Sequence, residues 1–413
     1  MTNKEYQILR DLAKQVAEIA VLPIQQETIS LWKALNGLKP VRPMVMIANV
    51  PWHEMNVDGE LSMQTEDLFC RLFEIQLRRI LYAWKHMRAD IVVEPVIEVP
   101  MVIMPHDLYY LGLLPAESIV TTDPENDVVS HSYSDQLKTE DDLEKIKCPE
   151  ITLHEEFTKL SQERALEIFG GILNVQMRGW VPEFQPWDTI VEWRGAESVL
   201  YDLADRPKFM HMLMARTTEA YLSMLDQLES KGLLSSDLNT VHCTGAYTDE
   251  LLAPSSLPLP HKAKDLWTAG MAQIFGGVSP AMHKEFELDY AVRWYERFGL
   301  VYYGCCEPLH GKIDIIRTIP HLRKISMSPW VDVEKGAERI GGDFVFSRKP
   351  NPAFLAGERW DVETMEQDMR DTMERCARHG CPVEFILKDI STVRYQPQRL
   401  WEWADIAMRL AHA

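Results

Sequence analysis

Short apolar runs alternate along the chain with longer segments in which apolar residues recur at helical spacing. Residues 42–50 form the first run and end in a polar loop, after which residues 65–87 carry apolar positions three or four apart. We expect strands at residues 42–50, 89–100, 171–179, 238–243, 299–306, 324–330, 343–350 and 383–391. We expect helices over the first 40 residues and at residues 65–87, 137–149, 195–232, 280–299 and 362–380, with a break at Pro207.

Such an alternation of strand and helix is typical of parallel βα units. About eight strands, and the lack of a GxGxxG or GxxxxGK[ST] motif, favour a closed (β/α)8 barrel over a doubly wound sheet. The predicted fold class is therefore α/β, a (β/α)8 TIM barrel with extra N-terminal helices. We expect residues 1–38 to form the helical extension and residues 39–413 to form the barrel.

Composition narrows the range of partners. The 413 residues are 46% hydrophobic, enough to bury a large core, yet no window approaches the ~18 consecutive apolar residues of a membrane span. Lys and Arg number 43 against 62 Asp and Glu, and the formal net charge of −19 disfavours nucleic acid and anionic membrane surfaces. The seven cysteines are odd in number and irregularly spaced, so we expect a reducing cytoplasm and no disulfide framework.

The polar residues that follow each apolar run are the candidates for chemistry, because barrel enzymes act at the carboxyl ends of their strands. They are Trp52, His53, Glu54, Glu94, Glu98, Arg178, Trp180, His242, Cys243, Cys305, Cys306, Glu307, Trp330, Lys349, Lys388 and Asp389. Zn²⁺ prefers thiolate, imidazole and carboxylate ligands, so Cys306 and Glu307, with Asp389 or His242, predict a zinc site. Plain packing is the alternative, since buried free cysteines and hydrogen-bonded core histidines are common.

Tryptophans are the second feature of the candidate site. Trp52, Trp180, Trp187 and Trp193 fall in expected loops or at strand ends. Such side chains can wall a pocket for a flat apolar ligand, although core packing is the more frequent role of any single tryptophan. Together they favour a hydrophobic substrate.

Residues 304–355, 139–149 and 197–214 resemble the uroporphyrinogen decarboxylase superfamily, with coverage from about Lys39 to the C-terminus. The similarity is closest to members that take part in corrinoid-dependent methyl transfer, including aromatic O-demethylation. The resemblance implies a (β/α)8 barrel and, as in relatives that act on coenzyme M, zinc held by a His-x-Cys pair and a later cysteine. Here Gly304 stands at the histidine, Cys306 at the first cysteine and Asp389 near the second, so Glu307 or His242 would replace lost ligands.

Two sequence features narrow the activity that this resemblance implies. Decarboxylases of the superfamily carry an arginine-rich segment after the first strand, and residues 43–55 contain no arginine, so tetrapyrrole decarboxylation is not expected. The family's cobalamin modules carry a DxHxxG signature, and none of the 13 histidines has an aspartate two residues before it. The resemblance therefore implies that a separate partner protein carries the corrinoid.

The expected enzyme is a methyltransferase that moves a methyl group from a small aromatic methyl ether, or a related methyl donor, to the cobalt of that corrinoid protein. A metal ion would activate the leaving oxygen. We expect Glu94, Glu98 or His53 to donate the proton, and the substrate to contact Trp52, Trp180, Trp187, Arg178 and Trp330. Two alternatives stay open: a decarboxylase that clamps a small acid with Arg178, Lys349 and Lys388, and a non-catalytic protein that binds a ligand or a corrinoid protein. A homo-oligomer is compatible with the sequence.

Overall fold

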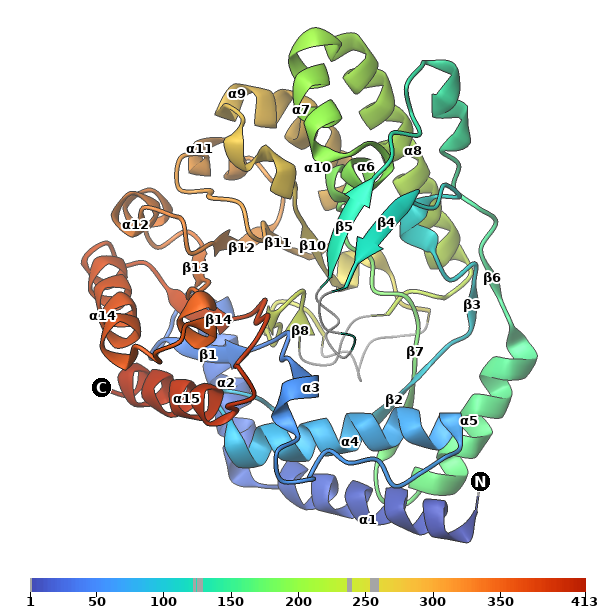
Figure 1. Ribbon diagram of the computed structural model, residues 1–413, viewed down its shortest axis with the longest axis vertical. Helices are drawn as coiled ribbons and strands as arrows, with labels where there is room; N and C mark the ends of the chain where they lie inside the picture. The colour runs from blue at the N-terminus through green and yellow to red at the C-terminus, as the bar shows by residue number, and fades with distance from the viewer. Residues whose placement is uncertain (1, 122–123, 125–128, 236–239, 253–259) are drawn as a thin grey trace.

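A computed structural model describes residues 2–121, 124, 129–235, 240–252 and 260–413. Eight strands of the described chain belong to parallel pairs, and Figure 1 shows them curving around one central region. They are β1 (Met44–Ile47), β2 (Val96–Pro100), β7 (Asn174–Arg178), β10 (Trp267–Gly270), β11 (Leu300–Tyr303), β12 (Leu322–Met327), β13 (Val345–Arg348) and β14 (Val383–Leu387). Their largely apolar and β-branched or aromatic residues suit strands that are buried on both faces.

Six of these strands form one parallel sheet in the order β1-β14-β13-β12-β11-β10, whereas β2 and β7 form a separate parallel pair. Isolated backbone hydrogen bonds span the gap between β1 and β2 and the gap between β7 and β10. The Asp90 N–H donates to the Val45 carbonyl oxygen at 2.9 Å, and Phe184 forms a parallel bridge with Gly270. The described residues thus form a curled half-barrel sheet with many helices, a TIM-like α/β arrangement, and their hydrogen-bond ladder does not close into the predicted complete barrel.

The structure corrects the prediction of a barrel strand at residues 238–243. Residues 238 and 239 lie outside the described chain, and β8 (Thr240–Val241) pairs antiparallel with β9 (Thr244–Gly245) as a small hairpin. The barrel position is taken by β10 instead, which pairs in parallel with β11. The apolar pattern did not reveal β10 because Thr, Ala and Gly make up most of its four residues and Ala and Gly have weak strand preference.

Helices line the outer side of the sheet, and Figure 1 shows α12, α14 and α15 outside the arc of strands. The α-helices are α1 (Asn3–Ala20), α2 (Pro23–Asn36), α3 (Trp52–Met55), α4 (Leu68–His86), α5 (Glu155–Phe169), α6 (Pro186–Arg194), α7 (Ala196–Asp205), α8 (Pro207–Ser230), α9 (Pro280–His283), α10 (Asp289–Tyr295), α11 (Ile313–Ile316), α12 (Val333–Ile340), α13 (Ala353–Ala356), α14 (Val362–Arg378) and α15 (Gln398–Ala411). In the described chain, none of them is long and apolar enough to cross a membrane.

Most predicted helices are confirmed. As predicted, Pro207 separates α7 from α8, because proline is favoured in the first turn of a helix and disfavours helical geometry in the residue before it. Two predicted helices differ from the structure. Residues 280–299 do not form one regular helix, since a π-helical turn (Lys284–Leu288) lies between α9 and α10. Residues 137–149 contain only a 3₁₀ turn, Asp141–Lys145. Three acidic residues in this short segment leave few apolar positions for packing.

The N-terminal helices pack in different places. Leu9, Leu12 and Val16 of α1 belong to a hydrophobic cluster shared with α4 and α5. Trp32 of α2 belongs instead to the cluster inside the half-barrel. Arg323, just inside the start of β12, donates to the carbonyl oxygen of Asn36 at the end of α2. Helix α2 therefore covers the amino ends of the strands, opposite to the expected site of chemistry.

A buried ion pair crosses the interior of the half-barrel. Lys324 of β12 and Glu384 of β14 are both 0% exposed, and their Nζ and Oε2 atoms lie 2.8 Å apart. The same Lys324 Nζ donates to Thr244 Oγ1 at 3.0 Å and to the Gly245 carbonyl oxygen at 2.9 Å. These bonds satisfy the buried ammonium and tie the β8–β9 hairpin to the sheet.

Among residues 101–135, the described part contains short strands where the sequence predicts an irregular stretch. Two short strands, β3 (Ile103–Met104) and β6 (Thr152–Leu153), pair antiparallel, and β4 (Glu117–Val120) pairs with β5 (Ser130–Tyr133). The β4–β5 hairpin is almost entirely exposed, so it lacks the one-sided apolar alternation by which a half-buried strand is detected.

Candidate active site

The turn that follows β11 has the sequence GCCE and holds its first cysteine firmly. Gly304 has a φ of 95°, and a Cβ at this position would lie 2.4 Å from Leu309 Cδ1. The Glu307 carboxylate accepts a hydrogen bond from the Cys305 N–H at 2.9 Å. Ser326 Oγ donates to the Cys305 carbonyl oxygen at 2.7 Å. The backbone on both sides of the Cys305 side chain is therefore fixed.

Five side chains from three parts of the chain meet beside this turn. This thiol–lysine cluster consists of Cys305 and Cys306 after β11, Lys388 and Asp389 after β14, and His242 between β8 and β9. Lys388 Nζ donates to Cys305 Sγ at 3.0 Å and lies 3.5 Å from His242 Nε2. Cys305 Sγ lies 3.6 Å from Cys306 Sγ, which donates to Asp389 Oδ2 at 3.4 Å. The fold thus brings together strand-end residues that are far apart in sequence.

The cluster stabilises a thiolate at Cys305. The hydrogen bond from Cys306 lowers the pKa of the Cys305 thiol, and so do His242 and the charge of Lys388. Together they outweigh burial and hold this pKa well below its ordinary value. The pKa of Cys306 is raised by its hydrogen bond to Cys305 and by burial. Of the two adjacent thiols, Cys305 therefore carries the negative charge and Cys306 keeps its proton.

The lysine of the cluster stays charged. Burial lowers the pKa of Lys388, but the neighbouring Cys243, the Cys305 thiolate and the Asp389 carboxylate outweigh burial and raise it. Its side chain is only 7% exposed. A cation held in this way, with little water around it, acts more strongly on a charge that develops nearby than a surface lysine would.

His242 is held between a carboxylate and the thiol–lysine cluster. Its Nδ1 lies 3.4 Å from Glu183 Oε1, in the loop after β7. Burial lowers the pKa of His242, but the neighbouring Cys243 and the hydrogen bonds to Cys305 and Glu183 outweigh burial and raise it to about 10. His242 and Asp389 also have left-handed backbones, with φ of 54° and 57°. Strained non-glycine residues of this kind gather at functional sites, where the surrounding structure holds them in place.

Buried hydroxyl and amine groups support the histidine ring from the barrel interior. The rings of His242 and Tyr302 stack with centroids 5.6 Å apart and an interplanar angle of 28°. The Tyr302 hydroxyl accepts a hydrogen bond from Lys349 Nζ, which also donates to Ser347 Oγ at 2.8 Å. Lys349 therefore serves the orientation of Tyr302 and, through the stacked rings, of His242.

Two further carboxyl groups influence the turn. Burial raises the pKa of Asp188 to about 6, against the opposing hydrogen bonds from Gln273, and the charge of Cys305 adds to the rise. Burial also raises the pKa of Glu307. Asp188 stands at the start of α6, where Gln273 Nε2 donates to it at 2.8 Å. A carboxyl group with such a pKa can exchange protons near neutral pH.

The four predicted zinc ligands do not form one ligand set. Glu307 faces backbone amides, since it accepts from the N–H groups of Cys305 and, at 3.4 Å, Ala272. Lys388 lies against both Cys305 and His242, where its charge would repel a bound cation. In the described part of the chain, no group of three or more His, Cys, Asp or Glu side chains is placed to hold a metal ion. The residues as arranged do not fit zinc, which remains a prediction for metal analysis to test.

The three predicted proton donors lie in contacts other than those of the thiol–lysine cluster. Glu94 accepts a hydrogen bond from the Tyr247 hydroxyl at 2.6 Å. Glu98 of β2 lies 3.8 Å from Arg178 of β7, an ion pair that joins these two strands. The His53 ring packs edge-on against Tyr395 with a centroid distance of 6.3 Å, and its Nε2 lies 3.7 Å from the buried Glu54 carboxylate.

The predicted substrate-binding tryptophans are scattered. Trp187 is fully buried in α6 and donates to the Phe286 carbonyl oxygen at 3.1 Å, which is a packing role. Trp180 follows β7 and lies near Tyr109, with ring centroids 5.1 Å apart. Trp330 is 69% exposed after β12. Trp52 lines a cavity beside β1.

Sequence reasoning missed the two carboxylates that come from the chain after β7. Glu183 is five residues beyond the end of that strand and Asp188 is ten beyond it. The strand-end rule could have reached Glu183 if the search had extended further into the loop. No sequence signal identifies Asp188, because its role depends on how α6 packs against the segment after β10.

Comparisons with known proteins support the fold. No protein-family model matches the chain, and no curated protein matches it. Among solved structures, the chain is similar to a methyltransferase from Methanosarcina mazei, with a TM-score of 0.51 and 11% sequence identity. The alignment covers 94% of this chain and 99% of that one. At this level of identity the likeness concerns architecture, and it extends over nearly the whole chain.

Proposed function

We propose that the protein is a methyltransferase that removes the methyl group of a small aromatic methyl ether and passes it to a corrinoid on a separate protein. The observation that carries the proposal is the thiol–lysine cluster, in which Lys388 after β14 and His242 between β8 and β9 lie next to each other beside the turn after β11. The structural neighbour is named a methyltransferase, and this supports methyl transfer as the class of reaction.

The difficult step in breaking an aryl methyl ether is departure of the phenoxide. The corrinoid supplies the nucleophile that takes the methyl carbon, while the electron pair of the breaking C–O bond stays on the oxygen. That oxygen needs a proton or a nearby positive charge. Lys388 and His242 hold protons at Nζ and Nε2, next to each other and largely shielded from water.

The proton affinity of the histidine suits this leaving group. The pKa of His242 is raised to about 10, close to the value of about 10 for a tyrosine phenol, so proton transfer to a phenoxide is nearly balanced in free energy. Glu183 at Nδ1 orients the ring and keeps Nε2 directed at the cluster. We assign the proton donation to His242 and the charge stabilisation to Lys388.

The proposal differs from the sequence-based expectation in the role of the cysteines. The Cys305 thiolate lies beside Lys388 and, together with the neighbouring Cys243, raises the pKa values of Lys388 and His242. Glu307 is a positioning residue, because it binds the backbone N–H of Cys305. Zinc analysis of the purified chain and of Cys306→Ala tests the alternative in which Cys306 is a metal ligand. Under that alternative, Cys306→Ala loses a bound zinc that Cys305→Ala retains.

Reconstitution tests the proposal. The purified chain is incubated with methoxylated aromatics, with and without a corrinoid protein reduced to the cob(I) state, and release of the phenol is measured. We expect phenol only when the corrinoid protein is present. His242→Gln and Lys388→Met should each slow release by about 100-fold or more, as loss of an acid or an electrostatic donor does. His310→Gln, a matched histidine in the loop after β11, should retain activity.

Several outcomes would contradict this assignment. Phenol release without any corrinoid would show a different methyl acceptor or a different reaction. Loss of carbon dioxide from an aromatic acid would favour the decarboxylase alternative, in which Arg178, Lys349 and Lys388 hold a carboxylate. Failure to turn over any methoxylated aromatic, with the corrinoid protein demonstrably reduced, would leave the non-catalytic alternative.

A further inference from the structure

The two adjacent cysteines in the turn after β11 differ in their surroundings. Cys305 is only 5% exposed, and its Sγ accepts a hydrogen bond from Lys388 Nζ at 3.0 Å, whereas Cys306 is exposed. Their Sγ atoms lie 3.6 Å apart. The proposed methyl transfer uses the charge of Cys305 and gives Cys306 no part in the chemistry. A thiolate with a second thiol beside it is the arrangement by which cysteines sense oxidants.

Each thiol has a neighbour that suits it to one step of an oxidation. Lys388 favours the thiolate of Cys305, and the thiolate rather than the thiol is the form that attacks an oxidant. Cys306 Sγ donates to Asp389 Oδ2 at 3.4 Å, so a carboxylate is in place to take its proton. A disulfide bond is about 2.0 Å long, so small rotations of the two side chains would join sulfurs that start 3.6 Å apart.

We propose that hydrogen peroxide converts Cys305 and Cys306 into a reversible disulfide between neighbouring residues. The Cys305 thiolate attacks one peroxide oxygen, the O–O bond breaks, and Cys305 becomes a sulfenic acid while hydroxide leaves. Cys306 then gives its proton to Asp389 and attacks the Cys305 sulfur, so that the S–S bond forms and the second hydroxide leaves. One hydroxide takes a proton from solvent and the other from Asp389. The peroxide is thereby reduced to water and the two thiols are oxidised.

The position of the two cysteines makes this disulfide easy to reduce again. Neighbouring Cα atoms are about 3.8 Å apart, closer than the range of about 4.4–6.8 Å that is usual for a disulfide, so the bond would be strained. The hydrogen bonds from the Cys305 N–H to Glu307 and from Ser326 to the Cys305 carbonyl oxygen also hold the turn in its reduced shape. Strained disulfides are labile and act as switches rather than as structural links.

Oxidation would remove a negative charge from the candidate active site. A disulfide is uncharged, so Lys388 and His242 would lose one of the groups that raise their pKa values. Loss of proton donation by His242 would follow. This consequence rests on the proposed function, whereas formation of the disulfide does not. The disulfide is therefore tested on the chain alone, without corrinoid protein or methyl donor.

Peptide mapping after peroxide treatment tests the proposal. The full chain is reduced, freed of reductant, treated with hydrogen peroxide, unfolded in an alkylating reagent and cut with trypsin. Trypsin releases residues 298–312 as one peptide, whose cysteines are Cys305 and Cys306. We expect this peptide to escape alkylation and to weigh two hydrogen atoms less than its reduced form, and dithiothreitol should restore both alkylation sites. In Cys306→Ser no second thiol can close the bond, so Cys305 should proceed to the sulfinic acid, which dithiothreitol does not reverse.

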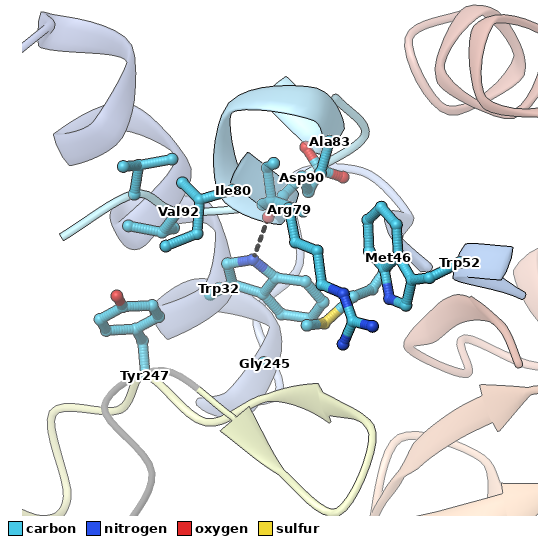
Figure 2. A pocket seen from close by; sticks show the side chains of 12 residues that line it. Trp32, Met46, Trp52, Arg79, Ile80, Ala83, Asp90, Val92, Gly245 and Tyr247 are labelled. Carbon is cyan, nitrogen blue, oxygen red and sulfur yellow. Dashed lines mark hydrogen bonds between the residues drawn. The ribbon is translucent and has the colours of Figure 1, made fainter. Parts of the chain in front are cut away.

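The chain offers two internal controls for this reaction. Cys376 and Cys381 form another pair, in which the Cys381 N–H donates to the Cys376 carbonyl oxygen at 2.9 Å. The hydrogen bond with Cys376, together with burial, raises the pKa of the Cys381 thiol, so this pair should stay reduced. Met46 reports on general oxidation, because Figure 2 shows it among the residues that line the cavity beside β1, whose volume of about 270 Å³ admits peroxide. The uncharged Met46 thioether should be oxidised only after the disulfide has formed.

Several results would overturn the proposal. Full alkylation of Cys305 and Cys306 after peroxide treatment would show that the bond does not form. A link from either residue to Cys243, or a link between two chains, would assign the oxidation to another thiol pair. The proposal is also wrong if wild-type Cys305 is oxidised beyond recovery by dithiothreitol, if the Cys376–Cys381 pair closes as readily, or if methionine sulfoxide appears first. Circular dichroism checks that Cys306→Ser is folded, and the wild-type result stands whatever that variant does.

Discussion

Replacing Lys388 with methionine tests the electrostatics of the candidate site directly. Methionine keeps most of the side-chain volume and removes the charge that lies 3.0 Å from Cys305 Sγ. Because the ammonium stabilises the thiolate, its loss must raise the pKa of the Cys305 thiol. The low exposure of Lys388, 7%, means that water replaces little of the lost interaction.

The size of this pKa shift follows from the short distance between Lys388 Nζ and Cys305 Sγ. Two unit charges 3.0 Å apart attract by about 5–6 kcal/mol at an effective dielectric constant of about 20, which is an upper bound. Measured hydrogen bonds to charged groups are worth about 1.5–3 kcal/mol. At about 1.4 kcal/mol for each pH unit, the midpoint of thiolate titration in Lys388→Met should rise by about 1 to 2 pH units.

The assay is the ultraviolet absorbance of the thiolate, titrated from neutral toward acid pH as far as circular dichroism shows the chain to be folded. Subtracting the curve of Cys305→Ala assigns the signal to Cys305. Lys349→Met is the matched control, since Lys349 is a buried lysine whose Nζ donates to Tyr302 and Ser347. A midpoint that does not move in Lys388→Met, or that moves as far in Lys349→Met, would refute the charge coupling on which the proposed mechanism depends.

Two further predictions concern the supports of the site and are measured by urea unfolding. Gly304→Ala should lower the free energy of unfolding by about 2 kcal/mol or more, because the φ of 95° disfavours a side chain and a new Cβ would lie 2.4 Å from Leu309 Cδ1. Gly311→Ala, with open space around the new Cβ, should leave the stability almost unchanged. Lys324→Met should lower the free energy of unfolding by about 3–5 kcal/mol, because it leaves the fully buried Glu384 carboxylate without its counter-charge. Replacing the exposed Arg293, which pairs with Glu219, should lower it far less. Equal losses within either pair of variants would contradict the corresponding argument.

The apolar pattern predicted much of the fold because most strands are buried on both faces and most helices have one apolar side. Runs such as that of β14, in which all five residues are buried, leave a continuous signal. The pattern failed at β10, because Ala and Gly, two of its four residues, have weak strand preference. Position 270 requires glycine, because a Cβ there would lie 1.8 Å from the Tyr295 hydroxyl oxygen. This packing requirement comes from helix α10, which is distant in sequence. Contacts of this kind leave no periodic trace in a single sequence.

The strand-end rule located the candidate site better than ligand chemistry described it. It selected Cys305, Cys306, Lys388, Asp389 and His242, and these residues meet in one cluster. What spacing could not indicate is the direction of each side chain. The sequence treated Glu307 as a ligand beside the thiols, but the turn directs its carboxylate to the backbone of Cys305. Only the decarboxylase alternative assigns Lys388 to a substrate carboxylate, and in the structure its Nζ donates to Cys305 Sγ.

The crowding of ionisable groups after β11 has a physical explanation in this arrangement. A buried lysine and a buried histidine would normally lose their protons, because burial disfavours the charged form. Cys243 and the Cys305 thiolate raise the pKa values of both Lys388 and His242, while Asp389 adds to the rise at Lys388 and Glu183 to the rise at His242. Cys305 therefore contributes as a counter-charge whether or not it meets a substrate. On this reasoning, Cys305→Ala should impair proton donation by His242 even if the methyl donor never touches the thiol. Cys305→Asp restores a negative charge, so it should recover part of the activity in the reconstituted reaction. If Cys305→Asp is no more active than Cys305→Ala while both remain folded, the sulfur itself takes part in the chemistry and the counter-charge argument is wrong.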